Sequence, residues 1–395
     1  MRLLLALASV TLTLSGCGEA ARPPLAGDVS DPGAGGNDVG LAPDVPPPPD
    51  LASPCGASTI ALEYQRPSLY FALDASGSML EAIPRGDTSA YPELGAPDNR
   101  YEALGDAIET VLERIGHRTS YGAALFPASG ASCGAGDEIL ELQAGDTVSY
   151  ALANQHGPVL NRLMSRIHRH DPGGGTPVGE TLNGIAARLA DVPGERYVFL
   201  LTDGGPNCNL DIDCAIDSCI PNIERFEAGD GLRCDAEINC CSDQVFGSGN
   251  CLDSSGTLNA VTQLSELGIR TFVIGMPGSG TYAGLLDELA VAGGTARDES
   301  PAYYGVSDAA ELLEIVSVLG AKVGLSCTVP LTEPPPDPNL VNVYFDGQLV
   351  AQDPLGGWTW SDDRTVTIVG ESCALLEARQ VLQLDVVAGC PVVIR

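Results

Sequence analysis

The sequence predicts an α/β fold with a doubly wound, mostly parallel sheet, a disulfide-rich insertion and a small C-terminal antiparallel β module. From residue 68 onward, short apolar runs alternate with segments whose apolar residues have helical spacing. The runs at residues 68–73 and 196–201 are almost entirely apolar, which is typical of parallel strands that are buried on both faces. After a proline-rich stretch at residues 334–338, short strand-like runs replace this alternation.

Each expected element has a local signal. In residues 100–115, Leu104, Ile108 and Val111 recur on one helical face. Pro177 stands at a helix start, where its missing N–H costs nothing. The expected strands of the sheet are residues 68–73, 121–126, 196–201, 270–276 and 303–306. The expected helices are residues 100–115, 159–167, 177–189, 257–267, 282–291 and 308–323. Right-handed crossovers then place the carboxyl ends of the parallel strands at one edge of the sheet.

Five oxygen-bearing side chains follow these strands and a glycine turn. Asp74, Ser76 and Ser78 form the sequence D-A-S-G-S directly after the first strand. Thr176 follows three glycines, and Asp203 follows the strand that ends near Thr202. Carboxylates and hydroxyls are hard donors that suit Mg²⁺, Mn²⁺ or Ca²⁺ rather than zinc or copper. Because such positions meet in the crevice beyond the strand ends, we predict one divalent-metal site.

This set resembles the metal-ion-dependent adhesion site of von Willebrand factor type A (vWA) domains, over about residues 66–326. The family's D-x-S-x-S, its threonine in G-G-T-P and its aspartate in T-D-G are all matched in order. The resemblance implies that Ser76 and Ser78 coordinate Mg²⁺ directly, and Thr176 directly or through water. It implies that Asp74 and Asp203 act mostly through water, and that a partner protein's carboxylate completes the coordination.

The resemblance therefore implies a protein-binding function and no enzyme activity. Two alternatives remain open: a structural envelope protein whose metal only stabilises the loops, and a Mg²⁺-dependent hydrolase. The hydrolase lacks support because no P-loop, nucleophile elbow or zinc-protease helix is present, and no motif places a histidine beside the serines. The net charge of −32, with a single lysine at Lys322, argues against nucleic-acid binding and against electrostatic adhesion to lipid.

The N-terminal segment predicts export and lipid anchoring. Residues 1–16 have a short positive start and an apolar stretch, and Leu14-Ser15-Gly16-Cys17 is typical of a bacterial lipoprotein signal. We expect the mature chain to start at a diacylated Cys17, with acyl chains as its only membrane anchor. Residues 17–54 are rich in Pro, Gly and Asp and form the expected tether. Gly18 favours the outer membrane over the inner one, and neither the side of that membrane nor the oligomeric state follows from the sequence.

The cysteines agree with an oxidising compartment. Without Cys17, the 13 cysteines leave an even number, which permits six disulfides. Seven lie close together: Cys208, Cys214, Cys219, Cys234, Cys240, Cys241 and Cys251. Because seven is odd, one partner must come from outside, and Cys133 is the nearest candidate. For the others we expect Cys55–Cys327 and Cys373–Cys390, although sequence alone does not determine the pairing. Zinc is the competing explanation of the cluster, and the spacing fits it poorly.

The expected domains follow from these features. A vWA domain should span residues 55–326, with the cysteine-rich insertion at residues 205–256. Between Asp203 and Asp253 there are 11 acidic and 2 basic side chains, which indicates either simple solvation of an exposed loop or selection of basic partners. Residues 327–395 should form the β module, with strands at residues 341–345, 358–360, 365–369 and 381–387. The sequence does not indicate the function of this module.

Overall fold

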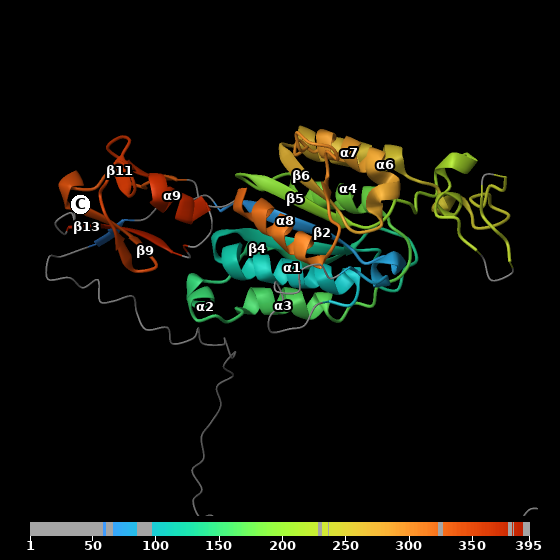
Figure 1. Ribbon diagram of the computed structural model, residues 1–395, viewed down its shortest axis with the longest axis horizontal. Coiled ribbons are helices and arrows are strands. Elements are labelled where there is room, and N and C mark those ends of the chain that lie inside the picture. Colours follow the sequence, from blue (N-terminus) through green and yellow to red (C-terminus); the bar gives the residue numbers. More distant parts are fainter. Residues whose placement is uncertain are drawn as a thin grey trace, which may run out of the picture. The chain divides into compact units, whose positions relative to one another are not determined.

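The computed structural model describes residues 58–60, 66–84, 97–227, 231–235, 237–322, 327–377, 381 and 383–389 (Figure 1). Cys17, the expected tether, Cys55 and Cys390 lie outside these residues. In the part of the chain that is described, no helix combines the length and the apolar character needed to cross a bilayer.

The larger sheet has six strands in the order β4-β3-β2-β5-β6-β7. Their bounds are Ser68–Asp74 for β2, Ser120–Phe126 for β3, Asp137–Ala144 for β4, Arg196–Thr202 for β5, Ile269–Gly275 for β6 and Tyr304–Gly305 for β7. All neighbouring pairs are parallel except β3 and β4. Counted along the chain, this is the 3-2-1-4-5-6 order of a doubly wound sheet, with its switch point between β2 and β5. The predicted fold class is confirmed.

Helices cover both faces of this sheet. Their bounds are Arg100–Ile115 for α1, Val148–Leu152 for α2, Pro158–Ile167 for α3, Val178–Leu189 for α4, Ile220–Ile223 for α5, Ser254–Glu266 for α6, Ala283–Ala292 for α7 and Ala309–Lys322 for α8. Figure 1 shows α1 and α3 on one side of the sheet and α6 and α7 on the other.

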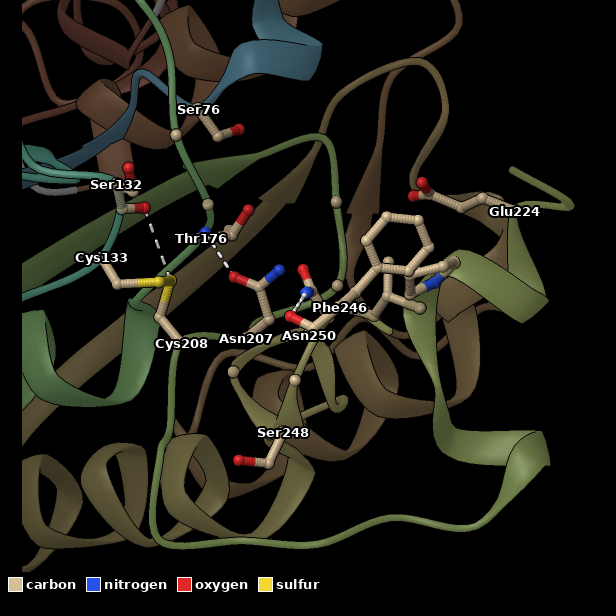
Figure 2. A pocket seen from close by; sticks show the side chains of 18 of the residues that line it. Ser76, Ser132, Cys133, Thr176, Asn207, Cys208, Glu224, Phe246, Ser248 and Asn250 are labelled. Carbon is tan, nitrogen blue, oxygen red and sulfur yellow. Dashed lines mark hydrogen bonds between the residues drawn. A yellow bond between two sulfur atoms is a disulfide. The ribbon is translucent and has the colours of Figure 1, made fainter. Parts of the chain in front are cut away.

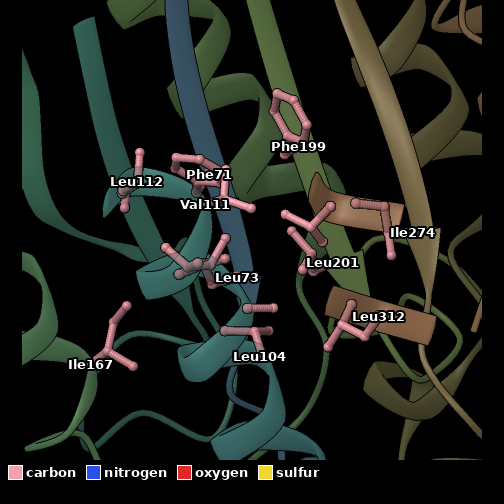
Figure 3. Close-up of a cluster of buried hydrophobic side chains, with 14 of the residues drawn as sticks. Phe71, Leu73, Leu104, Val111, Leu112, Ile167, Phe199, Leu201, Ile274 and Leu312 are labelled. Atoms are coloured by element: carbon pink, nitrogen blue, oxygen red, sulfur yellow. The ribbon is translucent and has the colours of Figure 1, made fainter. Parts of the chain in front are cut away.

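The alternation of side chains along β2 creates two separate cores. Phe71 and Leu73 pack in one apolar cluster with side chains of α1, α3 and α8 (Figure 3). Tyr70 and Ala72 point the other way and pack with α4, α6 and α7. Because every residue of β2 is buried, the strand is held on both faces, and its carboxyl end is a fixed point in the molecule.

Four elements of this domain differ from the prediction. The strand β4 was not predicted, because its sequence D-E-I-L-E-L-Q-A mixes acidic and apolar residues at an edge where only Leu140 is buried. The short helices α2 and α5 were not predicted either. The strand β7 was expected over residues 303–306 and is limited to its two residues, so the pairing of this edge with β6 is brief.

The C-terminal module contains two antiparallel sheets, with strand orders β1-β13-β9-β10 and β11-β12-β8. The bounds are Ser58–Ile60 for β1, Thr328–Pro330 for β8, Val341–Phe345 for β9, Gln348–Val350 for β10, Trp358–Trp360 for β11, Thr365–Ile368 for β12, Leu384–Ala388 for β13 and Gly370–Glu377 for the helix α9. Trp358 is fully buried in the core of this module. The expected antiparallel β module is confirmed.

The strand β1 departs from the expected domain boundary. We assigned residues 55–326 to the larger domain, but residues 58–60 pair with β13 and Ile60 packs in the core of the small module. The reason is that three residues carry too little local pattern to choose between two sheets, so strand pairing at a distance decides.

Five disulfides lie within the described residues: Cys133–Cys208, Cys214–Cys251, Cys219–Cys241, Cys234–Cys240 and Cys327–Cys373. The predicted link from the cysteine cluster to Cys133 is confirmed. The predicted pairs Cys55–Cys327 and Cys373–Cys390 are wrong, because Cys327 lies before β8 and is bonded to Cys373 in α9. Packing of β8 and α9 in one module brings these two sulfurs together, and chain order does not reveal that contact.

Candidate metal centre

The candidate centre lies at the carboxyl ends of β2 and β5, the two strands that flank the switch point. Asp74 is the last residue of β2, and Asp203 directly follows β5. The two strands are paired in parallel up to Leu73 and Leu201, so both aspartates leave the sheet side by side. Both are buried, with exposed fractions of 0% and 2%.

Backbone hydrogen bonds bring the glycine loop to the same place. Gly77 N donates to Gly174 O at 3.1 Å, and Gly173 N donates to Ala75 O at 2.7 Å. The loop thereby holds Thr176 next to the D-A-S-G-S turn. A Cβ atom at Gly204 would lie 3.8 Å from Thr176 Oγ1 and 4.0 Å from Ser78 Oγ, so these two hydroxyls border one small space.

Side-chain hydrogen bonds connect four of the five predicted residues. Ser78 Oγ donates to Asp203 Oδ1 at 2.8 Å, and the hydroxyls of Ser76 and Ser78 are 3.1 Å apart. The backbone N–H of Ser76 donates to Asp74 Oδ1 at 2.8 Å. Together with the position of Thr176, the structure brings all five residues to one centre. Their donor atoms are two carboxylates and three hydroxyls, which fit Mg²⁺, Mn²⁺ or Ca²⁺.

Three residues that the sequence analysis did not identify support this centre. Thr202 Oγ1 donates to Asp74 Oδ2 at 2.6 Å and fixes the second oxygen of that carboxylate. Asn207 Oδ1 accepts from Thr176 N at 2.6 Å and holds the glycine loop (Figure 2). The third residue, Arg100, opens α1 and donates to Asp203 Oδ2 at 2.5 Å. A polar residue at the end of β5 was a signal for Thr202, whereas Arg100 is 103 positions from Asp203 and has no local signal.

The two buried carboxylates are costly to ionise side by side in the absence of a cation. Burial, with repulsion from Asp203, raises the pKa of Asp74 to about 7, against the hydrogen bonds from Ser76 and Thr202. Burial also raises the pKa of Asp203, and the hydrogen bond from Arg100 opposes this rise. Arg100 also forms an ion pair with the exposed Glu81, with 2.7 Å between Nη2 and Oε2. Only part of its positive charge is therefore available to neutralise Asp203. A divalent cation would neutralise the negative charge that the two ionised carboxylates carry.

The hydroxyls, but not the aspartates, face a cavity of about 660 Å³. Ser76, Ser78 and Thr176 line it on one side, and residues of the insertion line it on the other. Figure 2 shows the hydroxyls of Ser76 and Thr176 on the side of the sheet and the ring of Phe246 across from them. The cavity is therefore shared between the predicted site and the insertion.

A disulfide and a hydrogen bond attach the insertion to the site. Cys133–Cys208 joins the start of the insertion to the segment after β3, and Asn207 N of the insertion donates to Thr176 O at 2.9 Å. A Cβ atom at Gly175 would lie 2.6 Å from both Asn207 Oδ1 and Cys208 Sγ, so a larger residue would force these atoms to shift. Close approach of the insertion therefore favours glycine at this last position of the run.

The cysteine cluster itself does not form a metal site. The sulfurs of Cys214, Cys241 and Cys251 lie within 4.8 Å of one another. Each of them belongs to a disulfide, so none is available as a thiolate ligand. The zinc alternative considered for this cluster is therefore wrong for these three cysteines.

Comparisons with known proteins found matches among solved structures alone. No family model matches the sequence, and no curated protein matches it. Solved structures similar to this chain include a pilus adhesin from Lactobacillus rhamnosus GG, at 14% identity and a TM-score of 0.45. That match covers 84% of this chain and 40% of the adhesin, so the chain spans less than half of that protein.

Two further similar structures are described by the name of von Willebrand factor. One is the vWF domain of a type V pili tip protein from Porphyromonas gingivalis, at 10% identity and a TM-score of 0.41, with 68% of this chain and 98% of that one covered. The other is a von Willebrand factor type A protein from Catenulispora acidiphila, at 12% identity and a TM-score of 0.39, with 85% and 64% covered. At identities this low, a shared function does not follow.

Proposed function

We propose that this chain is a binding protein that holds a divalent metal ion at Asp74, Ser76, Ser78, Thr176 and Asp203 and recognises a protein partner through it. The observation that carries this proposal is the two-layer arrangement of the centre. The three hydroxyls face an open cavity, whereas the two carboxylates lie buried behind them. An ion held there would be accessible from the cavity, and the two carboxylates would hold it on its buried side.

The donor set explains why such an ion would bind an acidic group. Neutral hydroxyls leave a coordinated cation most of its charge, and a carboxylate from the partner would complete the coordination with a charge-assisted contact. Mg²⁺ is the ion we expect in a cell envelope, and Mn²⁺ or Ca²⁺ would fit the same oxygens. Asp74 and Asp203 would orient the serines and any coordinated water.

The cavity wall offers little for a catalytic role. Among the described residues that line the cavity there is no histidine and no lysine, the bases that most often activate a serine hydroxyl. A Mg²⁺-dependent hydrolase would instead show turnover of a phosphoester that depends on Asp74. Such turnover, absent from Asp74→Asn, would replace the binding proposal.

The direct test is metal binding and metal-dependent capture. Calorimetry with Mg²⁺ should show one site, and Ser76→Ala should weaken it while the melting temperature of the metal-free protein stays nearly unchanged. Ser248→Ala is the matched control, because Ser248 lines the insertion side of the same cavity. A large loss of stability without a change in metal binding would support the structural alternative.

Partner capture from detergent-solubilised envelopes completes the test. We expect capture with Mg²⁺, loss with EDTA and loss in Asp203→Ala. Capture that survives both treatments would contradict a metal-centred interface.

We further propose that the protein is held at the outer membrane by a lipid on Cys17. The support is the lipoprotein signal in the sequence and the five disulfides in the described part of the chain, which require an oxidising compartment. Cys17→Ala should move the protein from the membrane fraction to the soluble fraction. Continued association with membranes would rule out the acyl anchor.

A further inference from the structure

The cavity at the metal centre has a second, apolar wall that the proposed function does not use. Phe226 and Phe246 of the insertion line it together with Leu210, Ile220 and Pro221. The two phenylalanine rings meet edge to face, with centroids 5.7 Å apart and an angle of 86°. Exposed fractions of 49% for Phe226 and 38% for Phe246 leave much of this aromatic pair open to water. Exposed aromatic pairs beside a cavity are typical of binding surfaces.

A disulfide holds this aromatic pair in place. Phe226 O accepts from Cys234 N at 3.0 Å, and Phe246 N donates to Cys240 O at 3.1 Å. Cys234 and Cys240 are bonded to each other and are fully buried. Both phenylalanines are therefore attached through their backbones to one cystine. Such a wall is ordered before a ligand arrives, which lowers the entropy lost on binding.

The charges around the cavity select the ligand further. Glu224 and Asp243 line the cavity on the side of the insertion, and no arginine or lysine is among its described lining residues. Glu224 Oε1 accepts from Tyr282 Oη at 2.8 Å, so its position is fixed. The wall repels acidic groups, and only the metal position attracts one. A ligand with several carboxylates would therefore be disfavoured, and a ligand with a single carboxylate would be accepted.

We propose that the cavity binds a protruding segment of a partner protein in which one carboxylate side chain lies next to a large apolar side chain. The carboxylate reaches the metal, and the apolar side chain packs on Phe226 and Phe246. A volume of about 660 Å³ holds only a few side chains, which excludes a flat protein face and favours a loop or an extended end. This inference rests on the proposed function, because it assumes the metal, but it assigns partner choice to the insertion.

A displayed library of short random peptides tests the proposal. Selection on the full chain with Mg²⁺, against a parallel selection with EDTA, should enrich peptides with one Asp or Glu beside Phe, Tyr, Trp or Leu. The double variant Phe226→Ser with Phe246→Ser should weaken an enriched peptide about tenfold or more. Calorimetry with Mg²⁺ alone should show unchanged metal affinity in this variant, and a thiol assay should confirm that its disulfides are formed.

Val245→Ser is the matched control. Val245 is 39% exposed, precedes Phe246 and is not among the residues that line the cavity. Its substitution should not change peptide affinity.

The outcomes separate this inference from the proposed function. Mg²⁺-dependent peptides that bind the double phenylalanine variant as well as the wild type would overturn the aromatic wall and leave the metal proposal intact. Peptides that ignore both EDTA and Ser76→Ala would overturn the metal proposal. Failure to enrich any Mg²⁺-dependent peptide, or equally tight binding of free phenylacetate, would overturn the assignment of a peptide segment.

Discussion

The cavity has two walls that are built in different ways. The wall at the sheet edge follows from β2 and β5, strands that are buried on both faces by apolar side chains. The insertion has little regular structure in its described part, and five buried cysteines, Cys219, Cys234, Cys240, Cys241 and Cys251, form its core. Packing fixes the first wall, and covalent bonds fix the second.

The two walls therefore have different tasks, because one carries the oxygen donors and the other sets the shape of the cavity. Oxygen donors must be placed within fractions of an ångström to hold a small cation, and the rigid strand ends suit the cation site that we propose. The insertion needs only to present a few side chains across the cavity, which a disulfide-bonded loop can do. Substitutions on the two sides should therefore affect different measurements.

The largest effect should come from the core beneath the sheet-edge wall. Phe199 is 1% exposed, and its ring centroid lies 5.4 Å from that of Phe71 and 5.1 Å from that of Phe272. Phe199→Ala should lower the free energy of unfolding by about 3–5 kcal/mol because it leaves a cavity. Phe246→Ala, in the insertion, should cost less than about 1 kcal/mol. Denaturant unfolding measures both, and equal losses would contradict the division into two walls.

Removal of one cystine should have the next largest effect, and only in the insertion. The Cys219–Cys241 bond spans 22 positions, and the loss of its loop constraint is worth about 3 kcal/mol. In Cys219→Ser with Cys241→Ser, amide hydrogen exchange should accelerate in the insertion while β2 and β5 stay protected. The matching double serine variant at Cys327 and Cys373 should leave the insertion protected. Loss of protection in β2 would show that both walls unfold together.

The third prediction concerns the pH dependence of the unfolding free energy of the metal-free protein. The pKa of Asp74 is raised by burial to about 7, above its value of about 3.9 in an unfolded chain. Because the folded state keeps this proton more tightly, the contribution to stability is complete below about pH 4 and is lost as the pH rises to about 7. The unfolding free energy of the wild type should therefore fall relative to that of Asp74→Asn as the pH rises from about 4 to about 7.

Denaturant unfolding at several pH values, without metal, checks this expectation. Saturating Mg²⁺ should reduce the dependence, since the ion favours the carboxylate form. A difference between wild type and variant that is constant from pH 4 to pH 7 would contradict the raised pKa.

The smallest effect concerns Arg100. Its side chain is 10% exposed, and its guanidinium neutralises part of the charge of Asp203 in the metal-free protein. Arg100 therefore competes with a metal ion for this carboxylate. Arg100→Gln should raise the affinity for Mg²⁺, measured by calorimetry, by up to about tenfold. Glu81→Gln is the control, because it removes the outer partner of Arg100 and leaves the contact with Asp203. A lower affinity in Arg100→Gln would mean that Arg100 mainly orients Asp203.

Local sequence patterns were sufficient for the sheet and for the five candidate residues. Each of these residues directly follows an apolar run or a glycine turn, so its place at the strand ends could be predicted without knowing any distant contact. The strand β4 was missed because an edge strand needs only one buried face and its acidic residues hide the pattern. The strand β1 was placed in the wrong domain because its pairing with β13 is a contact between distant segments.

The sequence by itself determined the doubly wound fold and the two strand ends that carry the proposed oxygen donors, because hydrophobic periodicity and strand direction are local properties. The tertiary structure alone decided that Arg100 contacts Asp203, that Cys327 bonds Cys373 and that Phe226 and Phe246 meet across the cavity from the serines. Each of these contacts joins segments that are separated along the chain, and their separation in sequence does not predict how close they lie in space. Packing of the whole fold decides which of them meet.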